Sequence, residues 1–178
     1  MYRIFTDYNL QMNYSIQTEP ITIDHQDFLE EMAYQALYVP EGQKPFPRKL
    51  IKHPDLAKYY KNWGKPNDLG YAAVDISSHK KVGASWLRLF LEPDKGFGYI
   101  NDKTPELAIS VLPEYRGMGI GTRLMTELLA LADKQFSAVC LSVNISNPAV
   151  RLYRRFGFAT IRQADDSLTM VRHKQDIK

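Results

Sequence analysis

Residues 111–125, Val-Leu-Pro-Glu-Tyr-Arg-Gly-Met-Gly-Ile-Gly-Thr-Arg-Leu-Met, join an apolar strand to a helix through a glycine-rich turn. The first turn of a helix has backbone N–H groups without a helical partner, and the helix dipole places partial positive charge there. Glycine lacks a Cβ atom, permits positive φ, and occupies alternate positions at Gly117, Gly119 and Gly121. Arg116 and Arg123 add positive charge. The segment therefore predicts a site for a phosphate or pyrophosphate.

The spacing of these glycines excludes two common phosphate-binding motifs. A nucleoside-triphosphate loop needs Gly-Lys-Ser/Thr, which occurs nowhere in the chain. A dinucleotide fold needs Gly-x-Gly-x-x-Gly directly after its strand and a carboxylate about 20 residues later. Here the spacing is Gly-x-Gly-x-Gly, and five residues separate it from the preceding strand. The next strand ends at Val143 and Asn144 without a carboxylate. A plain tight turn would need one glycine rather than three.

Two motifs resemble those of the GCN5-related N-acetyltransferase (GNAT) family. Arg116-x-x-Gly119-x-Gly121 is similar to the acyl-coenzyme A signature of that family, and residues 108–117 resemble its central strand and loop. Residues 147–158, Asn-Pro-Ala-Val-Arg-Leu-Tyr-Arg-Arg-Phe-Gly-Phe, resemble its later helix and the Gly-Phe pair that opens the sixth strand. The two motifs cover about residues 104–173 in the family's order, whereas residues 1–100 carry no comparably specific motif.

The resemblance implies an α/β fold and a binding site for acetyl-coenzyme A. The sheet would be mixed, largely antiparallel, of about six to seven strands flanked by helices, and splayed between the fourth and fifth strands. The pantetheine arm would lie in that gap against backbone groups of Ile109 and Val111. The pyrophosphate would meet the N–H groups of Arg116, Gly117, Met118, Gly119, Ile120, Gly121 and Thr122. Asn147 caps the later helix, and the resemblance adds a hydrogen bond from it to the pantetheine arm.

Thioester chemistry needs a proton donor at sulfur and an acceptor for the amine proton. Tyr153 matches the position of the family's general acid, and its phenol is protonated at neutral pH. A core tyrosine is the alternative, because Ala149 and Phe156 share its helix face. Glu106 is the candidate base, although it stands one position from the family's commonest register, and such a slip reverses the face of a strand residue.

The hydrophobic pattern predicts an α/β order of elements. Strands are expected at 14–23, 69–76, 82–91, 106–112, 138–143, 158–162 and 167–173. Helices are expected at 24–38 with Asp24 as its cap, 54–62, 119–133 and 148–156. The near-continuous apolar run at 138–143 predicts a strand covered on both faces. Residues 1–11 are expected to form an added arm, and residues 12–178 a single domain.

Composition favours one water-soluble domain. The chain has 178 residues, 44% of them hydrophobic and 24% charged, with a net charge of +3. That charge suits an anionic ligand but does not require nucleic acid, and no run approaches a membrane span or secretion signal. We expect a cytoplasmic protein with no nucleic-acid or membrane partner. Cys140, the only cysteine, suits a buried position. The four scattered histidines predict no metal site.

These features together favour an acetyl-coenzyme A-dependent N-acetyltransferase that acts on the primary amine of a small molecule or peptide. The acceptor stays open among small amines, protein termini or lysines, and amino sugars or antibiotics. Two other hypotheses stay open: an inactive module that binds or senses coenzyme A, and an interaction domain that uses the basic segment 44–65. A homodimer is also open, because dimers are the commonest soluble assembly.

Overall fold

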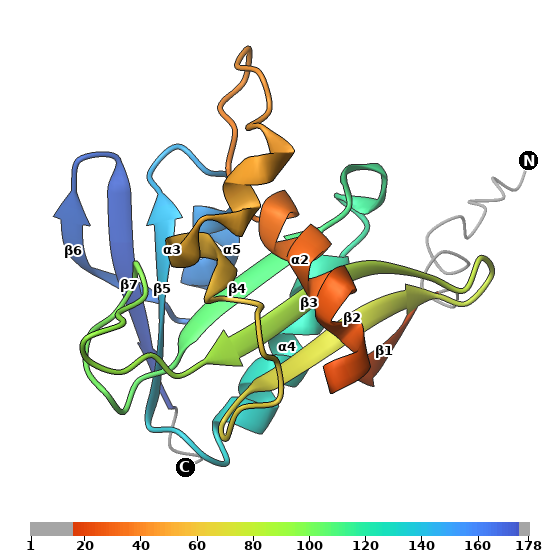
Figure 1. Ribbon diagram of the computed structural model, residues 1–178. Helices are drawn as coiled ribbons and strands as arrows, with labels where there is room; N and C mark the ends of the chain where they lie inside the picture. Colours follow the sequence, from red (N-terminus) through yellow and green to blue (C-terminus); the bar gives the residue numbers. More distant parts are fainter. Residues whose placement is uncertain (1–15, 175–178) are drawn as a thin grey trace, which may run out of the picture.

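The computed structural model describes residues 16–174, which form one seven-stranded sheet in the order β1-β2-β3-β4-β5-β7-β6 (Figure 1). Its strands are β1 (Ile16–Pro20), β2 (Leu69–Asp75), β3 (Lys80–Arg88), β4 (Glu106–Val111), β5 (Ala138–Asn144), β6 (Ala159–Ala164) and β7 (Ser167–His173). All neighbours pair antiparallel except β4 and β5, which are parallel. The predicted mixed, largely antiparallel sheet is confirmed; the predicted arm at 1–11 lies outside the described residues.

Helices cover both faces of the sheet (Figure 1). They are α2 (Gln26–Gln35), α3 (Pro54–Ala57), α4 (Ile120–Ala132) and α5 (Ala149–Arg155). On one face, the Ser110 hydroxyl of β4 donates to the Met32 carbonyl of α2 over 2.7 Å. On the other, the Ser85 hydroxyl of β3 donates to the Leu124 carbonyl of α4 over 3.1 Å. These buried hydroxyls fix the central strands between two helical layers.

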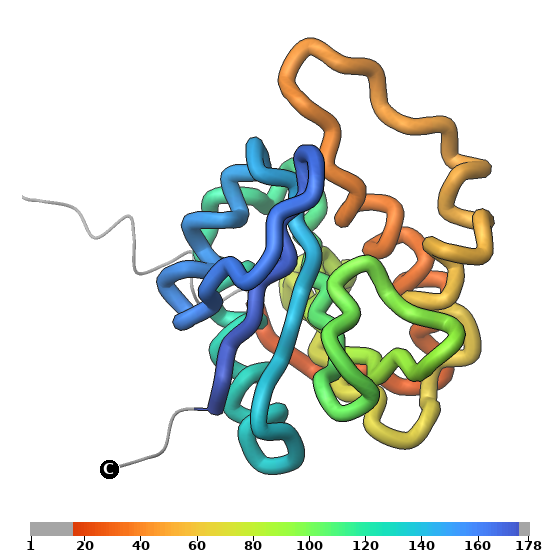
Figure 2. The backbone as a smooth tube through the Cα atoms, turned by 90° about the vertical axis from the view of Figure 1, so that its left-hand side faces the viewer, coloured from red at the N-terminus to blue at the C-terminus, as the bar shows by residue number. Residues whose placement is uncertain are grey.

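The strands β4 and β5 separate from one another along most of their length. Glu106 and Cys140 are their single register pair, and the Cys140 N–H donates to the Pro105 carbonyl over 3.0 Å. Beyond this point the strands diverge, so that β5, β7 and β6 form a wing at an angle to β1–β4 (Figures 1 and 2). The expected splay between the fourth and fifth strands is confirmed.

The first helix differs from the prediction at both ends. It opens as a 3-10 turn at Ile23–His25, and its cap is Thr22 rather than Asp24, with the Thr22 N–H donating to His25 Nδ1 over 2.9 Å. The regular helix stops at Gln35, three residues before the predicted end. Asp24 lies in the first turn, where its carboxylate faces the positive end of the helix dipole.

The helix predicted at 54–62 is cut short, and α3 ends at Ala57. A longer helix would pair the Asn62 N–H with the Lys58 carbonyl, but here the Asn62 N–H donates to Gln26 Oε1 over 2.9 Å and the Lys58 carbonyl accepts from Arg88 Nη1 over 2.8 Å. Arg88 also donates to the carbonyls of Lys61 and Asn62. Asn62 has a φ of 53°, which no longer continues a right-handed helix. Side chains from α2 and β3 therefore bind the backbone groups with which the helix would continue.

The expectation that β5 is covered on both faces is met by different kinds of structure. On one face, Val139 and Leu141 pack in a cluster with Leu128 of α4 and Val150 of α5. On the other face, the loop 89–105 crosses the strand so closely that a Cβ atom at Gly98 would lie 2.6 Å from the Leu141 carbonyl carbon. Cys140 is fully buried between these layers, and burial raises the pKa of its thiol.

Candidate functional site

The turn between β4 and α4 presents a continuous series of unpaired N–H groups. From Gly117 to Thr122, no backbone N–H donates to another residue within 16–174. Gly117 and Gly119 have φ values of 79° and 78°, and Gly119 directly precedes the helix. A Cβ atom at either glycine would meet no atom within 4 Å. The turn therefore forms an open concave surface of N–H donors at the positive end of a helix, a geometry that suits a pyrophosphate.

Three residues of this motif behave differently from their predicted roles. The Arg116 N–H donates to the Pro113 carbonyl and its Nε to the Val111 carbonyl over 2.9 Å, so Arg116 shapes the turn. Gly121 lies inside α4 without a positive φ, contrary to the expectation of positive φ throughout the glycine series. Arg123 donates to the Ile16 carbonyl and to Glu127, and thereby connects α4 to β1.

The gap between β4 and β5 exposes the edge of β4 on which Ile109 and Val111 were predicted to act. The Leu112 N–H donates to Val82 of β3 over 2.8 Å. Because hydrogen-bonding direction alternates along a strand, the backbone groups of Ile109 and Val111 point away from β3 and toward the gap. The Val111 carbonyl is already engaged by Arg116, which leaves its N–H and the Ile109 groups for a ligand.

The far wall of the gap is built by the start of α5. The Asn147 side-chain oxygen accepts from the Ala149 N–H over 2.9 Å, so Asn147 occupies the predicted capping position. A Cβ atom at Gly121 would lie 3.6 Å from the Leu152 side chain, an ordinary van der Waals distance, so α4 and α5 pack together at this point. The helix ends before Gly157, whose φ of 85° supports the predicted glycine stop.

Tyr153 lies on α5 and is buried, with 7% of its surface exposed. Its ring meets Phe158 edge-on with centroids 6.0 Å apart. Burial raises the pKa of its phenol above the ordinary value of 10, so Tyr153 stays protonated throughout the physiological range. The residue therefore has both the packing of a core tyrosine and the protonation state of a proton donor.

Glu106 lies at the apex of the gap, with 4% of its surface exposed. Glu106 and Ser110 are four residues apart on β4, so their side chains lie on the same face of the sheet. This is the face that carries α2. Oε1 accepts from the Tyr59 hydroxyl over 2.9 Å and from the Gly98 N–H over 2.8 Å. Oε2 is the one buried side-chain polar atom in residues 16–174 that has no partner. Burial raises the pKa of Glu106 to about 7, against the hydrogen bonds that lower it.

The surroundings of Glu106 were not foreseen from the sequence. Tyr59 follows α3, and its ring lies between Phe90 (centroids 4.8 Å apart) and Phe97 (5.9 Å, stacked). The loop 89–105 then passes over the carboxylate, and a Cβ atom at Gly96 would collide with Oε2. No local motif marks Tyr59, which falls inside the helix expected at 54–62.

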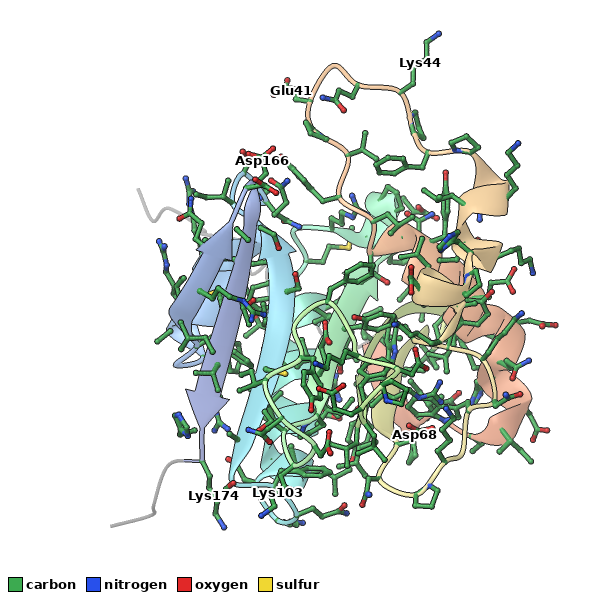
Figure 3. All side chains as sticks on the ribbon, turned by 60° about the vertical axis from the view of Figure 1, so that its left-hand side comes forward. Glu41, Lys44, Asp68, Lys103, Asp166 and Lys174 are labelled. Atoms are coloured by element: carbon green, nitrogen blue, oxygen red, sulfur yellow. The ribbon has the colours of Figure 1, made fainter. Side chains whose placement is uncertain are left out.

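A second loop, residues 36–47, projects beyond the sheet near the end where β4 and β5 diverge (Figures 1 and 2). Figure 3 shows Glu41 and Lys44 at its tip and Asp166 of the β6–β7 turn, all at this same end of the molecule. The Tyr38 hydroxyl donates to the Ser146 carbonyl over 3.0 Å and so connects this loop to the β5–α5 connection. The projecting loop and the β5–α5 connection therefore lie together at the end where β4 and β5 diverge.

Two large aromatic residues of this region, Trp63 and Trp86, belong to the core. Trp86 is 1% exposed and its indole N–H donates to the Tyr59 carbonyl, while Trp63 donates to Ile21. Tyr34 lies at the projecting loop instead, where its hydroxyl donates to the Phe46 carbonyl over 2.6 Å. The tryptophans are therefore structural.

The basic segment 44–65 forms a separate surface feature. Arg48 pairs with Glu31, and Lys52 with Glu30. A surface hollow of about 310 Å³ lies nearby, lined by Lys52, Pro54, Ala57, Lys58, Lys61, Asn62, Lys65 and Asp94. Within residues 16–174, no three His, Cys, Asp or Glu side chains gather where a metal ion would bind. No helix of the described chain has the length and hydropathy needed to cross a membrane.

Comparison with known proteins agrees with this geometry. The model of the acetyltransferase (GNAT) family matches residues 27–158. An N-alpha-acetyltransferase of Sulfurisphaera tokodaii is 37% identical over 59 residues, which make up 32% of this chain and 35% of that protein. The chain thus matches only about a third of the length of this curated relative.

Solved structures with the same fold include two acetyltransferases. A putative GNAT-family acetyltransferase from Bordetella pertussis is 25% identical, with a TM-score of 0.63 over 89% of this chain and 95% of that one. The PaiA N-acetyltransferase from Thermoplasma acidophilum, solved in complex with coenzyme A, is 18% identical, with a TM-score of 0.64 over 89% and 99% of the two chains. Because the family model spans most of the chain and the glycine turn and the splayed strands lie within its match, this protein belongs to the GNAT acetyltransferase family.

Proposed function

We propose that this protein is an acetyl-coenzyme A-dependent N-acetyltransferase whose acceptor is a primary amine. The observation that supports this most directly is the run of unpaired N–H groups from Gly117 to Thr122, which opens beside the gap between β4 and β5. The turn has the donors for a pyrophosphate, and the edge of β4 has the backbone groups for the amides of a pantetheine arm. The solved complex of the related PaiA N-acetyltransferase with coenzyme A supports the same assignment.

Acetyl-coenzyme A would supply a thioester, whose carbonyl carbon forms the new C–N bond as its C–S bond breaks. Glu106 is the proposed base, because it is the buried carboxylate at the apex of the gap and its Oε2 has no hydrogen-bond donor. A carboxylate with a pKa of about 7 is well matched to that task near neutral pH. Tyr153 is the proposed acid, because its raised pKa keeps the phenolic proton available for the departing sulfur.

Binding and turnover test this proposal in two steps. Coenzyme A at one hundred times its dissociation constant should add about 2.7 kcal/mol to the free energy of unfolding, which a thermal shift detects. A panel of polyamines, amino sugars and peptides with free termini, assayed for thiol release from acetyl-coenzyme A, should then identify the acceptor class. Binding without thiol release from any amine would instead support an inactive coenzyme A-binding module, and absence of any stabilisation would support an interaction domain.

A further inference from the structure

Tyr59 makes two hydrogen bonds that connect three separate parts of the chain. Its hydroxyl donates to Glu106 Oε1 on β4 over 2.9 Å and accepts from the Phe97 N–H of the loop 89–105 over 2.7 Å. The Tyr59 backbone is held in turn, because the Trp86 indole of β3 donates to its carbonyl over 3.0 Å. The phenol therefore has one geometry, set by a strand, a loop and its own turn.

The two donors on Glu106 both bind the same oxygen. Tyr59 and the Gly98 N–H occupy Oε1, whereas Oε2 has no partner although it is buried. An unpartnered buried carboxylate oxygen is costly, and proteins retain such groups where they serve a function. We propose that Tyr59 is the positioning residue of this site, which fixes the carboxylate of Glu106 at the apex of the gap in the orientation in which it takes the proton of the acceptor amine. This inference rests on the proposed function.

The other charged and titratable groups around Glu106 leave Tyr59 as its main side-chain partner. Lys58 lowers the pKa of Glu106 through its charge, but its ammonium group is bound to Asp94 at 3.2 Å and to the Lys95 carbonyl. From β5, Cys140 faces the carboxylate as a buried neutral thiol. From β3, the register partner Arg88 is committed to Asp68, with Nη2 and Oδ2 2.6 Å apart.

Removal of the phenolic hydroxyl should make Glu106 harder to ionise. In Tyr59→Phe the ring keeps its contacts with Phe90 and Phe97 while Oε1 loses one of its donors. Loss of a hydrogen bond to a charged group raises the pKa of a carboxyl by about one or more. The pKa of Glu106 should therefore rise from about 7 to about 8. The acidic limb of the kcat/KM profile should move with it, so that kcat/KM falls about fivefold at pH 7 and is unchanged above about pH 9.

Carbon-13 NMR titration of the Glu106 carboxyl, with Glu106→Gln to assign the signal, measures this pKa without any substrate. Tyr99→Phe is the matched control, because Tyr99 lies on the same loop and donates to Asp102 over 2.6 Å. It should leave the Glu106 titration unchanged. Incorporation of 3-fluorotyrosine at position 59 keeps the hydroxyl and makes it a stronger donor, so the pKa should fall; this probe also serves if Tyr59→Phe does not fold.

The outcomes separate the role of Tyr59 from the proposed reaction. An unchanged Glu106 titration in folded Tyr59→Phe, or in the fluorinated protein, would overturn the positioning role. A changed titration without movement of the acidic limb would overturn it as well. If Glu106→Gln keeps full activity and the same pH profile, the assignment of Glu106 as base fails instead, while the NMR titration still measures what Tyr59 does to the carboxyl.

Discussion

Glu106 and Cys140 form the single register pair between β4 and β5, and this pair marks the apex from which the two strands diverge. The glycine turn follows the opposite end of β4, after Val111. The sheet gap therefore runs from a set of N–H donors to a buried carboxylate. The proposed function assigns anion binding to the turn and proton transfer to the apex, and the two can be tested independently.

The first prediction concerns the glycines of the turn. Gly119→Ala places a methyl group in open space at a φ of 78°, where it would obstruct a pyrophosphate. We expect coenzyme A to bind about tenfold or more weakly, since a loss of about 1.4 kcal/mol has that effect. Isothermal titration of coenzyme A into the variant measures the loss.

Gly42→Ala is the control for backbone strain. Gly42 has a φ of 81°, and a methyl group there would also meet no atom within 4 Å, but this glycine lies in the projecting loop. Both variants should lose about 1–2 kcal/mol of stability, because both require a left-handed conformation of alanine. Equal loss of coenzyme A affinity in the two variants would argue against the turn as the binding site.

The second prediction concerns the proton donor. Tyr153→Phe removes the hydroxyl and keeps the edge contact with Phe158. The turnover rate should fall on the order of 10² to 10⁴-fold, while the affinity for coenzyme A stays the same. Tyr60→Phe is a matched control, because Tyr60 is 1% exposed and its hydroxyl donates to the Ile51 carbonyl. Stopped-flow measurement of thiol release compares the two, and similar rates in both variants would remove Tyr153 from the reaction.

The third prediction concerns stability as a function of pH. Burial raises the pKa of Glu106 from 4.5 to about 7, so the folded state binds this proton more tightly than the unfolded chain. The resulting stabilisation is fully present below about pH 4.5, decreases as the pH rises, and is lost above about pH 7. Its size is on the order of 3 kcal/mol, taking 1.36 kcal/mol for each pKa unit.

Glu106→Gln should abolish this dependence, because the amide does not titrate. Relative to the natural protein, the variant should therefore gain free energy of unfolding between about pH 4.5 and pH 7. Urea unfolding at a series of pH values measures the difference between the two proteins. A difference that stays constant over this interval would show that folding does not raise the pKa of Glu106.

The fourth prediction concerns the buried ion pair between Arg88 and Asp68. Arg88→Met leaves Asp68, which is 2% exposed at its side chain, without its guanidinium partner, and three backbone carbonyls without a donor. We expect a loss of about 3–5 kcal/mol, as for other broken buried pairs. Lys80→Met breaks the exposed pair with Glu114 and should change the midpoint of urea unfolding far less. Comparable losses in the two variants would contradict a special role for Arg88.

Several features of the site were predictable from neighbouring residues alone. The glycine series placed a turn of positive φ between a strand and a helix, and Gly117 and Gly119 adopt it. The family resemblance placed Ile109 and Val111 at the gap, and the pleat of β4 turns their backbone groups toward it. Local sequence was sufficient because the constraint in each case acts within a few residues: a missing Cβ atom, an unpaired first helical turn, or the pleat of a strand.

The limits of such reasoning lie where side chains from distant segments compete with local hydrogen bonds. The helix predicted through Asn62 ends at Ala57, and the Asn62 N–H and the Lys58 carbonyl, which a longer helix would pair, bind the side chains of Gln26 and Arg88 instead. Gly121 belongs to the same glycine series as Gly119, but it lies inside the helix and has no positive φ. Neither outcome is encoded in the residues adjacent to it.

The sequence by itself determined the location of the glycine turn and the positions of the strands along the chain, since both follow from backbone geometry over short spans. Only the tertiary structure decided the chemistry of Glu106. Its burial, which raises its pKa, is completed by the loop that carries Gly98, while Tyr59, 47 residues away, binds Oε1 and leaves Oε2 without a partner. The ionisation of a carboxyl is set by the water and donors around it, and packing alone brings these together.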